Sequence, residues 1–171
     1  QVRIAAVDDV LLQGDISAAT KIAGDGGEVG LLSTTGNLFV FGTVSATGAN
    51  NGGNVSMFAT TGGLAIDGFV SANGGAGNGG QVSGVADDVV LTENSGVSAN
   101  GGGGNGGLVG FRATSALAAY GLLSAHGGTA GGSIVTSTDG TFDIRGLFVD
   151  AGADTGTAGS WVLSAPTLTV L

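Results

Sequence analysis

The 171 residues carry four Lys and Arg against thirteen Asp and Glu, a net charge of −9, so the clustered cations that nucleic acid or an anionic membrane would require are missing. Cysteine is absent, which excludes disulfides and thiolate metal sites, and no apolar run reaches the ~18 residues of a membrane span. There are 37 glycines, but 42% of residues are hydrophobic and no Gly-x-y triplet recurs, so neither a disordered chain nor collagen fits.

A glycine doublet followed by a branched apolar residue recurs along the whole chain. The second glycine of each copy stands at Gly27, Gly53, Gly80, Gly107, Gly132 and Gly159, at intervals of 26, 27, 27, 25 and 27 residues. A fixed period of this length is typical of a solenoid, in which each repeat buries its apolar face against its neighbours. At these turns glycine is expected to supply positive φ, and Asp25, Asn51, Asn78 and Asn105, which precede four of the doublets, are expected to tolerate the left-handed conformation.

Each period contains three short stretches in which apolar residues alternate, beginning with the stretch that starts at Val2. The first stretch follows the doublet, as in Val55–Ala59; the second has apolar residues two apart, as in Leu64 and Ile66; the third reads Val-Ser-Ala, as at Val70. Period-two alternation predicts strands with one buried face. We therefore expect an all-β fold, a right-handed parallel β-helix with three strands per rung of about 27 residues and six to seven rungs.

Stacking of the rungs predicts columns of equivalent residues. An inward alanine column is expected at Ala18, Ala46, Ala72, Ala99, Ala125 and Ala151. A second inward column is expected at Val29, Val55, Val82, Val109, Ile134 and Val162, and an outward column at Ser17, Ser45, Ser71, Ser98, Ser124 and Asp150. Asn51, Asn78 and Asn105 precede successive doublets and are expected to pair their amides from rung to rung.

Other motifs have plain structural interpretations. Gly75–Gly80 and Gly102–Gly107 match G-x-G-x-x-G, but a strand and not a helix is expected after each, which argues against nucleotide binding. Asp8-Asp9 and Asp87-Asp88 occupy one rung position three rungs apart, which favours solvated turn carboxylates over a calcium site.

Isolated polar residues offer no catalytic constellation. His126 is expected to be an exposed turn residue without convergent partners, and Asp143 with Arg145 to form a surface ion pair. Asn54 begins a glycosylation sequon and could be exposed just past its turn. We expect no enzymatic activity and no cofactor or metal.

The run Gly-x-Val-Ser-Ala-x-Gly, then a glycine-rich turn and Gly-Gly-x-Val, resembles the β-helical repeats of filamentous-haemagglutinin-type exoproteins. The segment from Gly156 to Pro166, with Gly159-Ser160-Trp161, is similar to one common in that family, and the likeness covers essentially the entire chain. The glycine-rich passenger domains of autotransporters have similar sequence repeats. The resemblance implies a secreted bacterial surface protein, exported by two-partner secretion, that acts in adhesion, aggregation or biofilm matrix.

We therefore expect residues 1–171 to be one β-helix region that acts as an adhesive and structural stalk segment at the bacterial cell surface. Its expected partners are neighbouring rungs of the same or an adjacent chain, and surface glycans or proteins. A self-assembling filament subunit and a β-helix enzyme acting on polysaccharide are the alternatives. Because neither end reads as a polar cap, both are expected to continue into further β-helix, in this chain or in a neighbouring molecule.

Overall fold

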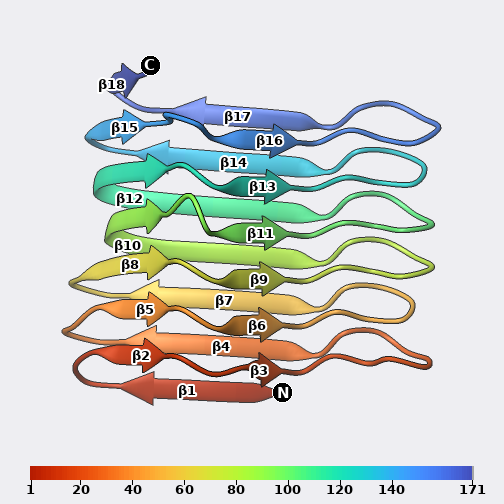
Figure 1. The fold of residues 1–171 in the computed structure, drawn as a ribbon, viewed down its shortest axis with the longest axis horizontal. Helices are drawn as coiled ribbons and strands as arrows, with labels where there is room; N and C mark the ends of the chain where they lie inside the picture. The colour runs from red at the N-terminus through yellow and green to blue at the C-terminus, as the bar shows by residue number, and fades with distance from the viewer. Residues whose placement is uncertain (171) are drawn as a thin grey trace.

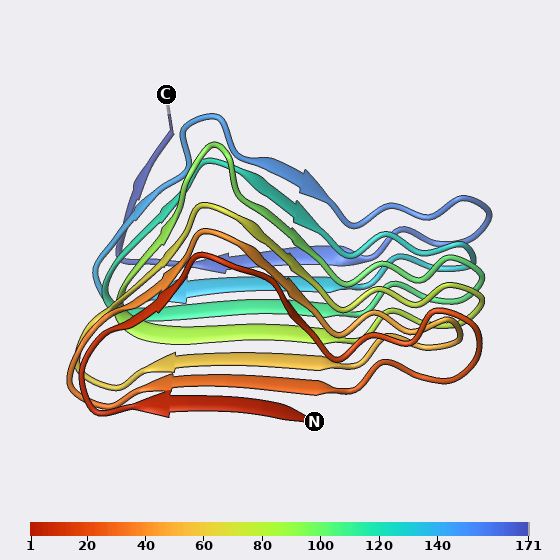
Figure 2. The same ribbon diagram turned by 60° about the horizontal axis from the view of Figure 1, so that its bottom comes forward.

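The computed structural model describes residues 1–170 and is a right-handed parallel β-helix with three strands in each turn (Figure 1, Figure 2). The chain runs along one broad face, returns along two shorter faces, and rises by one rung. Every strand pair in the ladders is parallel. The expected fold class is confirmed. No helix long and apolar enough to cross a membrane occurs among residues 1–170.

The strands stack into three faces, numbered in chain order. Face 1 contains β1 (Val2–Ala6), β4 (Glu28–Ser33), β7 (Asn54–Ala59), the first halves of β10 (Gln81–Leu91) and β12 (Leu108–Ala119), β14 (Ser133–Thr138) and β17 (Ser160–Ser164). Face 2 contains β2 (Val10–Leu12), β5 (Leu38–Val40), β8 (Gly63–Ile66), the second halves of β10 and β12, β15 (Thr141–Asp143) and β18 (Thr167–Thr169). Face 3 contains β3 (Ile16–Ser17), β6 (Thr43–Ser45), β9 (Phe69–Ser71), β11 (Gly96–Ser98), β13 (Leu122–Ser124) and β16 (Phe148–Asp150).

Corners between faces 1 and 2 absorb differences in rung length. β10 and β12 run through this corner without a break, and their register shifts between Ala86 and Asp88 before pairing resumes. The register within each face is unaffected, since Val82 pairs with Val109 before the shift and Val89 with Leu117 after it. Differences in length at this corner are thus accommodated without displacing the core.

The core consists of the inward columns predicted from period-two alternation. Val29, Val55, Val82, Val109 and Ile134 are fully buried and paired in register on face 1. The prediction for the last member was wrong: Trp161 pairs with Ile134, and Val162 is 52% exposed and pairs with Val135. Trp161 takes the inward position because its Nε1 donates a hydrogen bond to the buried Thr136 Oγ1 at 2.9 Å, which satisfies both groups.

A narrow projection leaves the corner between faces 3 and 1, at the right of Figure 1 and Figure 2. We call it the fin. It consists of the loops 18–27, 46–53, 72–80, 99–107, 125–132 and 151–159, which stack in register through parallel bridges such as Gly48 to Gly74 and Gly74 to Gly101. The outgoing and returning legs touch directly, since a Cβ on Gly48 would lie within less than 3.0 Å of the Asn51 carbonyl oxygen of its own loop. Backbone packs on backbone throughout the fin.

Candidate functional site

The alanine column lies at the base of the fin, inside the core, as predicted. Ala46, Ala72, Ala99 and Ala125 are fully buried, while Ala18 and Ala151 in the terminal rungs are partly buried. Each alanine carbonyl accepts a hydrogen bond from the second glycine of the doublet that ends its loop, at 2.7–2.8 Å. The donors are Gly27, Gly53, Gly80, Gly107, Gly132 and Gly159. These bonds close the base of every loop.

The doublets are glycine for a steric reason, and the prediction that they supply positive φ was wrong. Positive φ is confined to Gly24 and Gly146 among residues 1–170, and no Asn or Asp there adopts it. A Cβ on Gly79 would come within less than 3.0 Å of the Ala99 carbonyl oxygen one rung above, and a Cβ on Gly80 equally close to the Gly53 carbonyl oxygen one rung below. The repeat therefore needs glycine because two rungs approach each other through bare backbone.

The asparagine ladder exists, but its hydrogen bonds differ from the prediction. Asn78 N–H donates to Asn51 Oδ1, and Asn105 N–H donates to Asn78 Oδ1, both at 2.9 Å. At its lower end Asp25 accepts from both the backbone N–H and the side-chain amide of Asn51, at 3.1 and 2.9 Å. The upper end is the Thr129 hydroxyl, which donates to Asn105 Oδ1 at 2.8 Å. The ladder joins side-chain oxygens to backbone N–H groups, and amide-to-amide pairing does not link Asn51, Asn78 and Asn105.

The paired aspartates share one rung position as predicted, through the ladder that joins β2, β5, β8 and β10. Asp9 Oδ1 accepts from the backbone N–H of Asn37 at 2.6 Å, and Asp87 Oδ1 accepts from the Thr114 hydroxyl at 2.7 Å. These carboxylates therefore bind the neighbouring rung. Among residues 1–170, no three His, Asp or Glu side chains are placed to hold a metal ion.

His126 has two acidic partners, which the sequence interpretation missed. Its Nδ1 lies 3.2 Å from Asp150 Oδ2 and its Nε2 lies 3.1 Å from Asp154 Oδ1, with 32% of the side chain exposed. Hydrogen bonds from the ring to the carboxylates of Asp154 and then Asp150 raise the pKa of His126. The backbone N–H of Gly152, together with the His126 contact, lowers the pKa of Asp150. The two carboxylates contact opposite nitrogens of the ring, so the three side chains do not converge on one coordination site. We call His126 with Asp150 and Asp154 the clasp. Asp150 and Asp154 follow His126 by 24 and 28 residues, which is about one rung, so this spacing could have predicted both contacts.

Asp143 and Arg145 form the predicted ion pair, with Arg145 Nη2 at 2.6 Å from Asp143 Oδ2. The structure adds Tyr120, whose hydroxyl donates to Asp143 Oδ2 at 3.1 Å and whose ring lies 5.6 Å from the guanidinium carbon. The Arg145 contact lowers the pKa of the Asp143 carboxyl and the same contact raises the pKa of Arg145. Both groups are held in their charged forms, which favours an ion pair over proton transfer at neutral pH.

The remaining motifs also have structural roles. The prediction that Asn54 could be exposed was wrong for its amide oxygen: Asn54 Oδ1 is buried, with no hydrogen-bond partner among the described residues. Gly75–Gly80 and Gly102–Gly107 lie in the fin and lead into β10 and β12, so strands follow both matches to the nucleotide fingerprint, as predicted.

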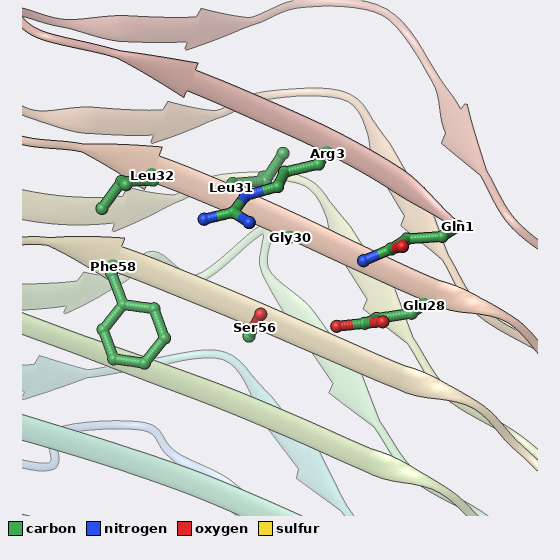
Figure 3. A pocket seen from close by; sticks show the side chains of 8 residues that line it. All are labelled: Gln1, Arg3, Glu28, Gly30, Leu31, Leu32, Ser56 and Phe58. Carbon is green, nitrogen blue, oxygen red and sulfur yellow. The ribbon is translucent and has the colours of Figure 1, made fainter.

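Two neighbouring hollows on the outside of face 1, together called the groove, were not predicted. Two hollows of about 230 and 320 Å³ lie end to end over rungs one to three and four to six. Their common floor is one outward column, Arg3, Gly30, Ser56, Ser83, Gly110 and Val135, in continuous register. One wall carries Glu28, Gln81 and Leu108; the other carries Leu32, Phe58, Val85 and Arg112. Figure 3 shows Leu32 and Phe58 on one side of the first hollow and Gln1 and Glu28 on the other.

A search of protein-family models, of curated proteins and of solved structures gave no match to this chain.

Proposed function

We propose that this chain is a structural and adhesive stalk segment of a secreted bacterial cell-surface protein. The observation that carries the proposal is the set of parallel ladders, in which rungs one to six are hydrogen bonded to one another along all three faces and the fin, and the last rung is bonded along faces 1 and 2. A force along the rod would have to break many backbone hydrogen bonds together before one rung separates. The bacterial surface location rests on the resemblance of the repeat to filamentous-haemagglutinin-type exoproteins.

The side chains support a mechanical role in a second way. Polar side chains at the surface of the fin hydrogen-bond to the adjacent rung, as Asn51 does with Asn78 and His126 with Asp150. The Tyr120 hydroxyl likewise donates to Asp143 one rung away, beside the ion pair of Asp143 with Arg145. These polar contacts favour cohesion between rungs.

Pulling on the two ends of single molecules tests the stalk role. We expect stepwise unfolding, each step releasing about one rung of ~27 residues and therefore roughly 90 Å of extended chain. Smooth extension at low force, like that of the same chain in urea, would contradict the proposal. Beads coated with the chain, compared under flow with albumin-coated beads, test adhesion to cells separately; equal retention would remove the adhesive part and leave the stalk.

A further inference from the structure

We propose that the groove on face 1 binds a linear, uncharged polysaccharide that lies along the axis of the rod. This adds a binding activity to the stalk role proposed above and does not depend on it, because a rod of any function could carry the same site. The groove covers six rungs, so at a strand spacing of ~4.8 Å it is roughly 24 Å long. That length accommodates several sugar rings.

The glycines in the floor are the first observation. Most glycines of the chain stand where a Cβ would meet backbone, but Gly110 has nothing within 4 Å of that position and Gly30 has only ordinary contacts, the nearest at 3.6 Å. Both lie in the middle of strands, where glycine weakens a sheet. The fold does not require glycine at either position, while an added side chain would fill the groove.

Unused polar groups are the second observation. Two arginines of the rod are paired, Arg112 in the wall of the second hollow with Asp139, and Arg145, outside the groove, with Asp143. Arg3 and Glu28 border the first hollow, and neither forms an ion pair or a side-chain hydrogen bond within residues 1–170. Arg3 extends across Gly30 into the hollow (Figure 3).

The two walls match the two kinds of surface on a sugar ring. One wall offers the amide and carboxylate groups of Gln81 and Glu28 to hydroxyl edges, while the other offers the exposed Phe58 ring, 44% accessible, and Leu32 to the apolar C–H face. The formal charges of Arg3 and Glu28 cancel, and Arg112 is neutralised by Asp139. An anionic polymer would also be repelled by a rod of net charge −9, which favours an uncharged chain.

An extended peptide fits this groove poorly. The groove runs across the strands of face 1, whose backbone groups are already paired with both neighbours from β4 to β14. A peptide lying there could not add a strand, and its own N–H and C=O groups would lack the backbone partners that peptide recognition by sheets uses. A sugar chain needs only side-chain partners for its hydroxyls.

The test is calorimetric titration of the chain with cellohexaose, laminarihexaose and chitohexaose, with cellobiose, a galacturonic acid hexamer and an uncharged Ser/Gln peptide as comparisons. We expect at least one neutral hexamer to bind with a dissociation constant below about 1 mM, and at least about tenfold more tightly than the disaccharide. Amide shifts in NMR spectra should be confined to face 1.

Gly110→Val and Gly30→Val should weaken that binding by about tenfold or more, with a thermal midpoint no lower than that of the parent. Gly14→Val is the matched control, because Gly14 also has open space for a Cβ and lies outside the groove. Phe58→Ala, a change at an exposed ring, gives a second variant that does not threaten folding. The proposal is overturned if no neutral hexamer binds at millimolar concentration, if the variants bind as well as the parent, if the anionic hexamer or the peptide binds more tightly, or if face 1 proves to be a dimer contact.

Discussion

Adding one methyl group should have opposite effects at two glycines of the same ladder system, Gly80 and Gly110. At Gly80 a Cβ would lie closer than 3.0 Å to the Gly53 carbonyl oxygen, whereas ordinary contact begins at 3.4 Å. That oxygen accepts from Gln81 N–H at 2.9 Å, and Gly80 N–H donates to the Ala72 carbonyl at 2.7 Å. Gly80→Ala must displace this backbone and weaken both hydrogen bonds.

The size of each effect follows from these contacts. Two hydrogen bonds at ~1 kcal/mol each give a loss of about 2 kcal/mol in the free energy of unfolding for Gly80→Ala. At Gly110 the methyl group meets nothing, so Gly110→Ala should gain roughly 0.4–1 kcal/mol by restricting the unfolded chain. For a chain of this size the thermal midpoint should fall by roughly 4–8 °C in the first variant and rise by roughly 1–4 °C in the second.

Circular dichroism melts of the parent and both variants, with calorimetry to check that unfolding is one transition, measure these shifts. The steric explanation of the glycine doublets is refuted if Gly80→Ala melts with the parent, or if the two variants shift in the same direction. A fall for Gly110→Ala alone would mean that its position is not open.

Three further changes test the core, the ladder and the clasp. Ala72→Leu should cost roughly 1–3 kcal/mol by overpacking the fully buried corner, and an unchanged melt would place Ala72 outside. Asn78→Ala should cost ~1 kcal/mol because Asn105 N–H loses its acceptor, while Asn78→Asp, which keeps an acceptor oxygen, should cost less; equal losses would contradict the ladder. Folding raises the pKa of His126 above its usual 6.5, so the protonated ring stabilises the folded state fully below pH 6.5. That stabilisation disappears as the pH rises through the folded pKa, and the thermal midpoint of the parent should therefore drop over this pH range. His126→Gln should show no such drop. The same drop in both proteins would contradict a stabilising role of the His126 contacts with Asp150 and Asp154.

The inward half of this structure could be predicted from the sequence because it repeats. Alternation within each period identified the buried residues from Val29 to Ile134, and the doublets identified turns at positions where the loops of the fin end. The end of the column was misassigned to Val162, although each other member follows its second glycine by two residues and the same offset from Gly159 gives Trp161. The hydrogen bond from Trp161 to Thr136 is not a pattern in the sequence.

Features that depend on contacts between particular rungs could not be predicted. The left-handed turn expected at the doublets and the close backbone approach that the structure has instead both require glycine, so the sequence alone cannot separate them. His126 meets Asp150 and Asp154 only because one rung places them together. The groove was not predicted because the residue type in its outward column changes from rung to rung, from Arg3 to Val135. The residues of its walls can be identified only once the register between strands is known.

The fin has a thermodynamic consequence for the whole rod. The heat capacity of unfolding rises with the apolar surface that becomes exposed and falls with the polar surface. Fin loops such as 72–80 and 99–107 bury peptide groups against peptide groups, so their unfolding adds little or negative heat capacity. The chain should therefore fall below the usual ~12–15 cal/mol/K per residue. A smaller heat capacity flattens the curve of stability against temperature, so the rod should lose little of its stability on cooling.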